Sequence, residues 1–117
     1  NKNQKNNYLV PDLKKKIKRS KNKILLHNLS HYRDFISMKD IAKIIFYLFK
    51  KNFKGVINIA SGRGVYLKDI AIYISKHYKK NVDFKDNNKK TYLIANTKKL
   101  KKIYKKRIIQ NLKQLIF

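Results

Sequence analysis

The chain has 117 residues, which suits one domain, because single cores of about 100–150 residues are the commonest size. It has no cysteine, which excludes disulfides and thiolate metal sites, and its histidines, His27, His31 and His77, lack the spacing of a zinc site. Its apolar runs fall short of the roughly 18 residues of a membrane helix, and no signal peptide is recognisable. We therefore expect a cytoplasmic protein.

The formal net charge of +25 would attract polyanions through the release of counterions. However, only Arg19, Arg33, Arg63 and Arg107 among the 31 basic residues are arginine, and the rest are lysine. Lysine, asparagine, isoleucine, tyrosine and phenylalanine are the residues favoured by A/T-rich codons, so we attribute the charge to codon bias. The alternative is a small basic nucleic-acid-binding module in which the eight tyrosines stack on bases.

The N-terminal part is predicted to form a helix and a short strand. Residues 1–7 are polar and are expected to be a frayed or cut N-terminus. A helix is predicted from Val10, with Pro11 in its first turn, where the missing N–H costs nothing. A basic turn then precedes an apolar strand at residues 24–26. The apolar face of the helix consists, at spacings of four, of Leu9, Leu13 and Ile17.

A second helix is predicted to follow an extended segment at residues 33–36. Ser37 and Asp40 form an S-x-x-D capping box, so this helix should begin at Ser37. After Gly55, the brevity and β-branching of residues 56–60 predict a buried strand. The predicted buried face of the helix consists of Ile41, Ile44, Ile45, Leu48 and Phe49.

A glycine turn at residues 61–64 is predicted to lead from that strand into a third helix at residues 67–78. Tyr66 precedes this helix and removes the expected N-cap, because its side chain is not one that caps helices. The buried face of the helix is predicted to contain Leu67, Ile70, Ala71, Ile74 and Tyr78. The last predicted elements are a strand at 81–84, a loop at 85–90, an extended segment at 92–95, a small helix from a Thr97 cap through residue 103, and a helix at 109–116.

Two blocks of this sequence carry a resemblance to a known family. They are HYRDFISMKDIAKIIFYL, residues 31–48, and GVINIASGRGVYLKDIAIYIS, residues 55–75. Together they resemble the C-terminal, substrate-binding part of the extended short-chain dehydrogenases/reductases, the NAD-dependent sugar-nucleotide epimerases and dehydratases. The resemblance covers residues 8–117. It implies an α/β fold, a small mixed helix-strand portion of a Rossmann-type enzyme whose N-terminal NAD-binding half is absent.

The resemblance also implies roles for two arginines. Arg33 corresponds to the family's arginine that grips the diphosphate of the substrate, while Asp34 beside it would orient the backbone or pair with a neighbour. The alternative for Arg33 is an ordinary Arg–Asp surface pair. Arg63, in the glycine turn, would cover a base or a phosphate, or else lie in solvent beside a tight strand–helix connection.

Four further residues are substrate-binding candidates through the same resemblance. Leu25 and His27 fall on a strand that runs along the nucleobase, although His27 also suits a structural role. Leu9 matches a position whose backbone approaches the substrate phosphates, although its spacing also suits core packing. Where the family has an Arg-Pro-Gly-Asp loop, this chain offers only Lys89 or Lys90 as a point charge, or a solvated loop. Residues 96–100 resemble the family's Asp-Thr-Ser-Lys-Leu helix start, with Asn96 in place of aspartate as a possible cap.

The family's cofactor and catalytic signatures are not found in this sequence. No glycine-rich turn follows a first strand, and Tyr47 and Lys51 have the Tyr-x-x-x-Lys spacing but lie in the helix after Arg33. We therefore expect no catalytic, cofactor-binding or metal-binding residue in this chain. NAD or NADP would be bound by the full-length parent.

The parent is expected to be a homodimer that acts on a nucleotide-diphosphate sugar in surface polysaccharide synthesis. Its NAD-binding half would be the chain's partner. If the strand at residues 56–60 belongs to a sheet completed by that half, the chain alone should be marginally folded and prone to aggregation. An inactive remnant of a truncated gene is a further alternative.

Overall fold

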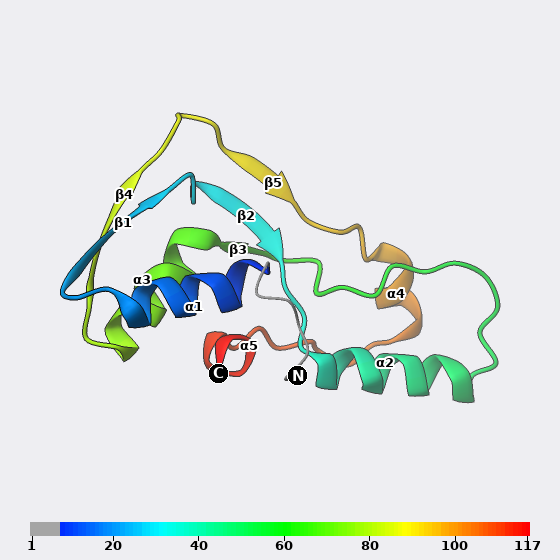
Figure 1. The fold of residues 1–117 in the computed structure, drawn as a ribbon. Coiled ribbons are helices and arrows are strands. Elements are labelled where there is room, and N and C mark those ends of the chain that lie inside the picture. The colour runs from blue at the N-terminus through cyan, green and yellow to red at the C-terminus, as the bar shows by residue number, and fades with distance from the viewer. Residues whose placement is uncertain (1–7) are drawn as a thin grey trace. The chain divides into compact units, whose positions relative to one another are not determined.

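The computed structural model describes residues 8–117, and the prediction for residues 1–7 lies outside these. The chain folds into two compact units (Figure 1). The first unit contains the chain up to His31, residues Tyr66–Thr91 and Ile116. The second contains Tyr32–Val65, Tyr92–Leu115 and Phe117. Each unit is therefore assembled from segments that are far apart in the sequence.

The first unit is a pair of parallel strands with two helices. Its elements are α1 (Leu9–Arg19), β1 (Lys23–His27), α3 (Leu67–His77) and β4 (Asn81–Lys85). β1 and β4 pair in parallel, with Leu25 opposite Asp83. α1 packs against α3, and α3 packs against β4. These elements confirm the predicted first and third helices and the predicted strands at 24–26 and 81–84.

Burial in the first unit follows the periods of its elements. Alternation along β1 buries Leu26, which is 5% exposed, and leaves Leu25 50% exposed on the other face with His27. Tyr66 precedes α3 without a side-chain capping bond, as its ring predicted, and Tyr78 is only half-buried at the other end. The buried apolar side chains are Leu13, Ile17, Leu26, Leu29, Leu67, Ile70, Ala71, Ile74 and Ile116.

The second unit contains most of a three-stranded sheet. One end residue of each strand, His31, Tyr66 or Thr91, is assigned to the first unit. The strand order is β3 (Gly64–Tyr66), β2 (His31–Asp34) and β5 (Thr91–Leu93). β2 begins two residues earlier than the predicted extended segment and ends at Asp34. β3 was not predicted, because three residues after a glycine turn carry no pattern of their own.

Three helices complete the described chain. They are α2 (Met38–Lys50), α4 (Lys98–Ile103) and α5 (Leu112–Ile116). α5 is shorter than predicted, because its cap is Asn111, whose side chain accepts from the N–H of Lys113. None of the helices in residues 8–117 has the length and apolar character needed to cross a membrane.

The capping prediction for α2 is confirmed. The hydroxyl of Ser37 accepts from the N–H of Asp40 at 3.0 Å and donates to the carboxylate of Asp40 at 2.6 Å. For α4 the expected Thr97 cap is wrong, because Thr97 is buried and makes no capping bond. The side chain of Asn96 instead accepts from the N–H of Lys98 at 3.1 Å.

The predicted buried face of α2 is too wide. Only Ile44 and Leu48 are buried, in a cluster with Leu100 and Tyr104. Ile45 is 53% exposed and Phe49 is 78% exposed, which corrects the prediction for both side chains. The reason is that the core cluster includes Ile44 and Leu48 but does not reach these two side chains.

The predicted strand at residues 56–60 is wrong for the described chain. This segment has no regular secondary structure, and Val56 is 85% exposed. A strand needs a hydrogen-bonded neighbour, but here side chains take that place. The amine of Lys99 donates to the carbonyl of Val56 at 2.7 Å, and the amide of Asn58 donates to the carbonyl of Asn96 at 3.2 Å.

Replacement of the α2 cap tests whether this local signal stabilises the second unit. We expect Ser37→Ala to lower the free energy of unfolding by about 1 kcal/mol, because the N–H of Asp40 loses its acceptor. Urea unfolding followed by circular dichroism measures this change. Ser37→Thr keeps a hydroxyl and should retain most of the stability, so an equal loss in both variants would contradict a capping role.

Candidate functional site

Asp34, the last residue of β2, holds the glycine turn of residues 61–64 through both carboxylate oxygens. Its Oδ1 accepts from the N–H of Ser61 at 3.0 Å and from the hydroxyl of Ser61 at 2.5 Å. Its Oδ2 accepts from the N–H of Gly62 at 2.9 Å and from that of Ala95 at 3.3 Å. Hydrogen bonds to an ionised carboxylate are the strong ones. Of the two roles expected for Asp34, these bonds agree with pairing to neighbouring groups, and the groups belong to segments distant in the sequence.

The two glycines of this turn are required by close packing. Gly62 has φ +73°, a conformation that L side chains rarely adopt, and a Cβ there would overlap the hydroxyl of Thr97. A Cβ on Gly64 would lie 2.7 Å from Cδ1 of Ile94 and 3.2 Å from Cβ of Tyr32. The space beside both glycines is thus filled by neighbouring side chains of the second unit.

Gln110 closes the same turn from the C-terminal part of the chain. Its Nε2 donates to the hydroxyl oxygen of Ser61 at 2.7 Å and to the carbonyls of Phe35 and Arg63, both at 3.1 Å. Sequence reasoning missed this residue, because a single glutamine carries no pattern that indicates distant partners. The turn is consequently fixed from two sides, by Asp34 and by Gln110.

The two arginine candidates both belong to the second unit. Arg33 is half-buried on β2, and its Nη1 donates to the carbonyl of Tyr32 at 2.8 Å. Arg63 is exposed in the turn and is one of the residues that line a cavity of about 500 Å³. Arg33 does not line this cavity, so the structure does not bring the two arginines to one wall.

The cavity beside Arg63 has a basic rim and a buried apolar floor. Leu100 is 1% exposed and Tyr104 is 8% exposed, whereas all the basic side chains of the rim are exposed. No acidic residue lines it. The basic rim consists of Arg63, Lys101, Lys102, Lys105, Lys106 and Arg107.

The other four candidates lie in the first unit. Leu25 and His27 share the exposed face of β1, while Leu9 is half-buried in the first turn of α1. Lys89 is exposed in the loop after β4, and its N–H donates to Oδ1 of Asn87 at 3.2 Å. Leu25 and His27 are thus brought together, and the other two lie on separate elements of the same unit.

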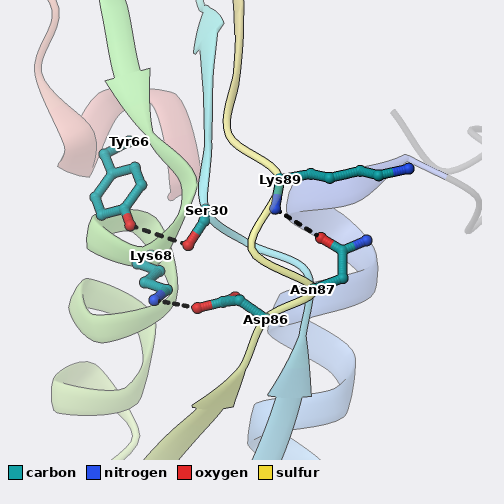
Figure 2. A network of polar contacts seen from close by, with 6 residues as sticks. All are labelled: Ser30, Tyr66, Lys68, Asp86, Asn87 and Lys89. Carbon is teal, nitrogen blue, oxygen red and sulfur yellow. Dashed lines mark hydrogen bonds and ion pairs between the residues drawn. The ribbon is translucent and has the colours of Figure 1, made fainter.

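An ion pair anchors the start of that loop to α3. Lys68 Nζ lies 2.5 Å from Oδ2 of Asp86, and the side chains are only 22% and 19% exposed (Figure 2). The hydrogen bond between them lowers the pKa of the Asp86 carboxyl and raises the pKa of the Lys68 amine. In Figure 2 the side chain of Lys89 extends away from this pair.

Tyr47 and Lys51, which share the family's catalytic spacing, make packing contacts. The hydroxyl of Tyr47 donates to the carbonyl of Ile103 at 3.0 Å, and its ring meets Tyr104 edge-on at 5.2 Å between centroids. The amine of Lys51 lies 5.7 Å from the centre of the Tyr47 ring. In the part of the chain that the structure describes, no group of three His, Cys, Asp or Glu side chains is placed to hold a metal ion.

Solved structures with similar folds define the class of this chain as α/β and Rossmann-type. UDP-N-acetylglucosamine 4-epimerase from Bacillus cereus is 23% identical, with a TM-score of 0.72 over 97% of this chain and 39% of its own. The structure of dTDP-glucose 4,6-dehydratase from Bacillus anthracis str. Ames in complex with NAD is 17% identical, with a TM-score of 0.72 over 97% of this chain and 38% of its own. GDP-mannoheptose C4 reductase from Campylobacter jejuni with NADP bound is 18% identical, with a TM-score of 0.72 over 94% of this chain and 42% of its own.

The family follows from the sequence. The family model described as "NAD dependent epimerase/dehydratase family" matches residues 1–60, which is more than half of the chain. The chain belongs to this family. No curated protein sequence matches it significantly. The chain spans 38–42% of the length of the three solved structures named above.

Removal of the Asp34 carboxylate should loosen the turn and the second unit. We expect Asp34→Ala to lower the free energy of unfolding by about 3 kcal/mol, because buried N–H donors lose a charged acceptor. Urea unfolding measures the loss, and hydrogen exchange should quicken at the amides of Ser61, Gly62 and Ala95. Asp69→Ala, an exposed carboxylate on α3, is the control. Unchanged exchange at those three amides would contradict the role of Asp34.

The Lys68–Asp86 pair should make the first unit sensitive to acid. The pKa of Asp86 is lowered by folding, so its contribution to stability is present above the ordinary value of 3.8 and is lost as pH falls through the folded pKa. The pKa of Lys68 is raised, so its contribution is full below 10.5 and is lost at higher pH.

The test of this pH dependence compares the wild type with Asp86→Asn by urea unfolding from neutral to strongly acidic pH. We expect the stability difference to be constant near neutrality and to vanish in acid. Asp69→Asn is the control for a change of one exposed carboxylate. A difference between wild type and Asp86→Asn that stays the same through the acid range would show that the ion pair does not cause it.

Proposed function

We propose that residues 8–117 are the substrate-binding part of an NAD(P)-dependent epimerase, dehydratase or reductase that acts on a nucleotide-diphosphate sugar. Family membership supports this reaction class. The observation that carries the proposal is the set of hydrogen bonds from residues 61, 62 and 95 to Asp34, because they fix the end of the strand that presents Arg33. The parent would be a cytoplasmic homodimer that makes activated sugars for surface polysaccharides.

In this proposal each candidate has a binding role. Arg33 contacts the diphosphate, where a guanidinium can make two parallel hydrogen bonds. Leu25 and His27 line the nucleobase from the exposed face of β1, a position that supports such a role because neither side chain belongs to the core. Leu9 and Lys89 approach the phosphates, and Arg63 covers the nucleotide from the glycine turn.

The chain would contribute positioning, and the bond changes would depend on groups outside it. When bound, the nicotinamide cofactor would accept a hydride from the sugar and later return it to the sugar. A dinucleotide site needs glycines that let a pyrophosphate approach the backbone. Here Thr97 fills the space beside Gly62, and Ile94 with Tyr32 fills that beside Gly64. This turn therefore does not fit a pyrophosphate, which supports the proposal that NAD(P) is bound by another part of the parent.

The proposed partner of the chain is the NAD-binding half of the same protein. Exposed apolar side chains on α2 support a surface covered by further polypeptide, since Ile45 is 53%, Phe46 62% and Phe49 78% exposed. We expect the chain alone to be prone to aggregation through this face, because nothing in its described residues covers it.

Substitution of Arg33 in the full-length protein tests the proposal. Arg33→Ala should weaken binding of a nucleotide-diphosphate sugar by about 1.5–3 kcal/mol, the range for a hydrogen bond to a charged group. Titration calorimetry with the nucleotide-sugar gives the Kd.

Two further variants separate geometry from charge. Arg33→Lys keeps the charge but loses the planar fork, so it should recover only part of the affinity. Arg19→Ala removes an exposed arginine of α1 and should leave the Kd unchanged. An unchanged Kd for Arg33→Ala would reject the diphosphate role.

A further inference from the structure

The basic cavity of the second unit holds two of the chain's four arginines. They are Arg63 and Arg107, and neither Arg19 nor Arg33 lines it. In a chain whose basic residues are mostly lysine, the arginines are the less expected basic residues. Arginine is also the side chain that recognises phosphate with a planar pair of donors. Their presence in one cavity therefore points to an anionic ligand more strongly than the net charge does.

The described chain supplies no counter-charge for this cavity. None of the six basic side chains on its rim forms an ion pair within residues 8–117. The second unit has only two acidic residues. Asp34 is engaged by the glycine turn and Asp40 by the cap of α2. Like charges held together repel one another, and a multivalent anion would relieve that repulsion.

The floor of the cavity indicates that the ligand carries more than phosphate. Leu100, Tyr104 and Ile108 line it together with Ala60, and no acidic side chain is present. Small-molecule sites are mostly apolar with a few convergent polar groups, and their volumes are about 300–1,000 Å³. The volume of about 500 Å³ lies in this range. A single cavity of this size suits one nucleotide better than a polymer, which needs a continuous groove.

We propose that this cavity binds a nucleoside phosphate, with the phosphates held by Arg107, Arg63 and the rim lysines and the nucleoside over the apolar floor. The site goes beyond the proposed substrate role, because Arg33 does not line it. Arg63 belongs to both proposals, so the test varies Arg107 and leaves Arg63 unchanged.

The test titrates the full chain with ADP by calorimetry, and maps the amides that shift by NMR. ADP should shift the amides of Ser61, Thr97 and residues 101–108. Arg107→Ala with Lys102→Ala should weaken ADP binding by about tenfold or more, as expected for the loss of charge-assisted contacts worth about 1.4 kcal/mol. Lys43→Ala with Lys54→Ala removes the same charge from exposed positions of the same unit that do not line the cavity. This control pair should leave the Kd nearly unchanged.

Three outcomes of these titrations would contradict the proposal. Equal weakening by the two double variants would show attraction to net charge alone. Equal affinity for inorganic pyrophosphate and ADP would remove the nucleoside from the site. Tighter binding of an oligothymidylate to the same amides would assign the surface to a nucleic-acid strand.

Two more measurements keep the result interpretable. Arg107→Lys retains the charge and should bind ADP with an affinity between those of the wild type and the double variant. If circular dichroism shows that the double variant is unfolded, Arg107→Lys takes its place in the test. Arg33→Ala should bind ADP as the wild type does. Loss of ADP binding in Arg33→Ala would place the nucleotide at the proposed substrate site and overturn the second site. Failure of the substrate proposal would leave this result unaffected.

Discussion

The carboxylate of Asp34 joins three segments of the second unit that are far apart in the sequence. Its acceptor bonds reach 27 residues along the chain to Ser61 and 61 residues to Ala95. Buried N–H groups must find acceptors, and a turn that contains a left-handed glycine leaves several of them without a partner in regular structure. One ionised side chain satisfies three of them. The strand that carries Arg33, the glycine turn and the segment before α4 therefore depend on a single acidic residue in a chain that has only six.

Local signals in the sequence predicted local structure well. The Ser37 cap, the apolar spacing of α1 and the short apolar run of β1 depend on residues a few positions apart, and the structure has all three elements. For Asp34 the resemblance suggested a local backbone role or a pairing with a neighbour, and it did not indicate that the partners would be Ser61, Gly62 and Ala95. The α/β class was predictable for the same reason.

The errors concern features that depend on distant neighbours. Residues 56–60 have a strand-like composition but no paired strand in the described chain, and contacts to Lys99 and Asn96 take up the polar groups. Ile45 and Phe49 fit the period of α2, yet the core cluster does not reach them. Gln110 could not be predicted, because its bonds to Phe35 and Ser61 span 75 and 49 residues. Periodicity reports which faces are apolar, and it does not report how much of a face is covered.

The interleaving of the two units limits when each of them can fold during synthesis. The first unit needs the chain up to His31 together with Tyr66–Thr91, and the second needs Tyr32–Val65 together with Tyr92–Leu115. When synthesis has reached residue 65, neither unit is therefore complete, because Asp34 still lacks its bond from Ala95 and the glycine turn still lacks its bonds from Gln110. Folding from local pieces is fast, whereas pairing of distant segments is slow. Nascent chains should thus keep Ile44 and Leu48 of α2 uncovered until Leu100 and Tyr104 have emerged.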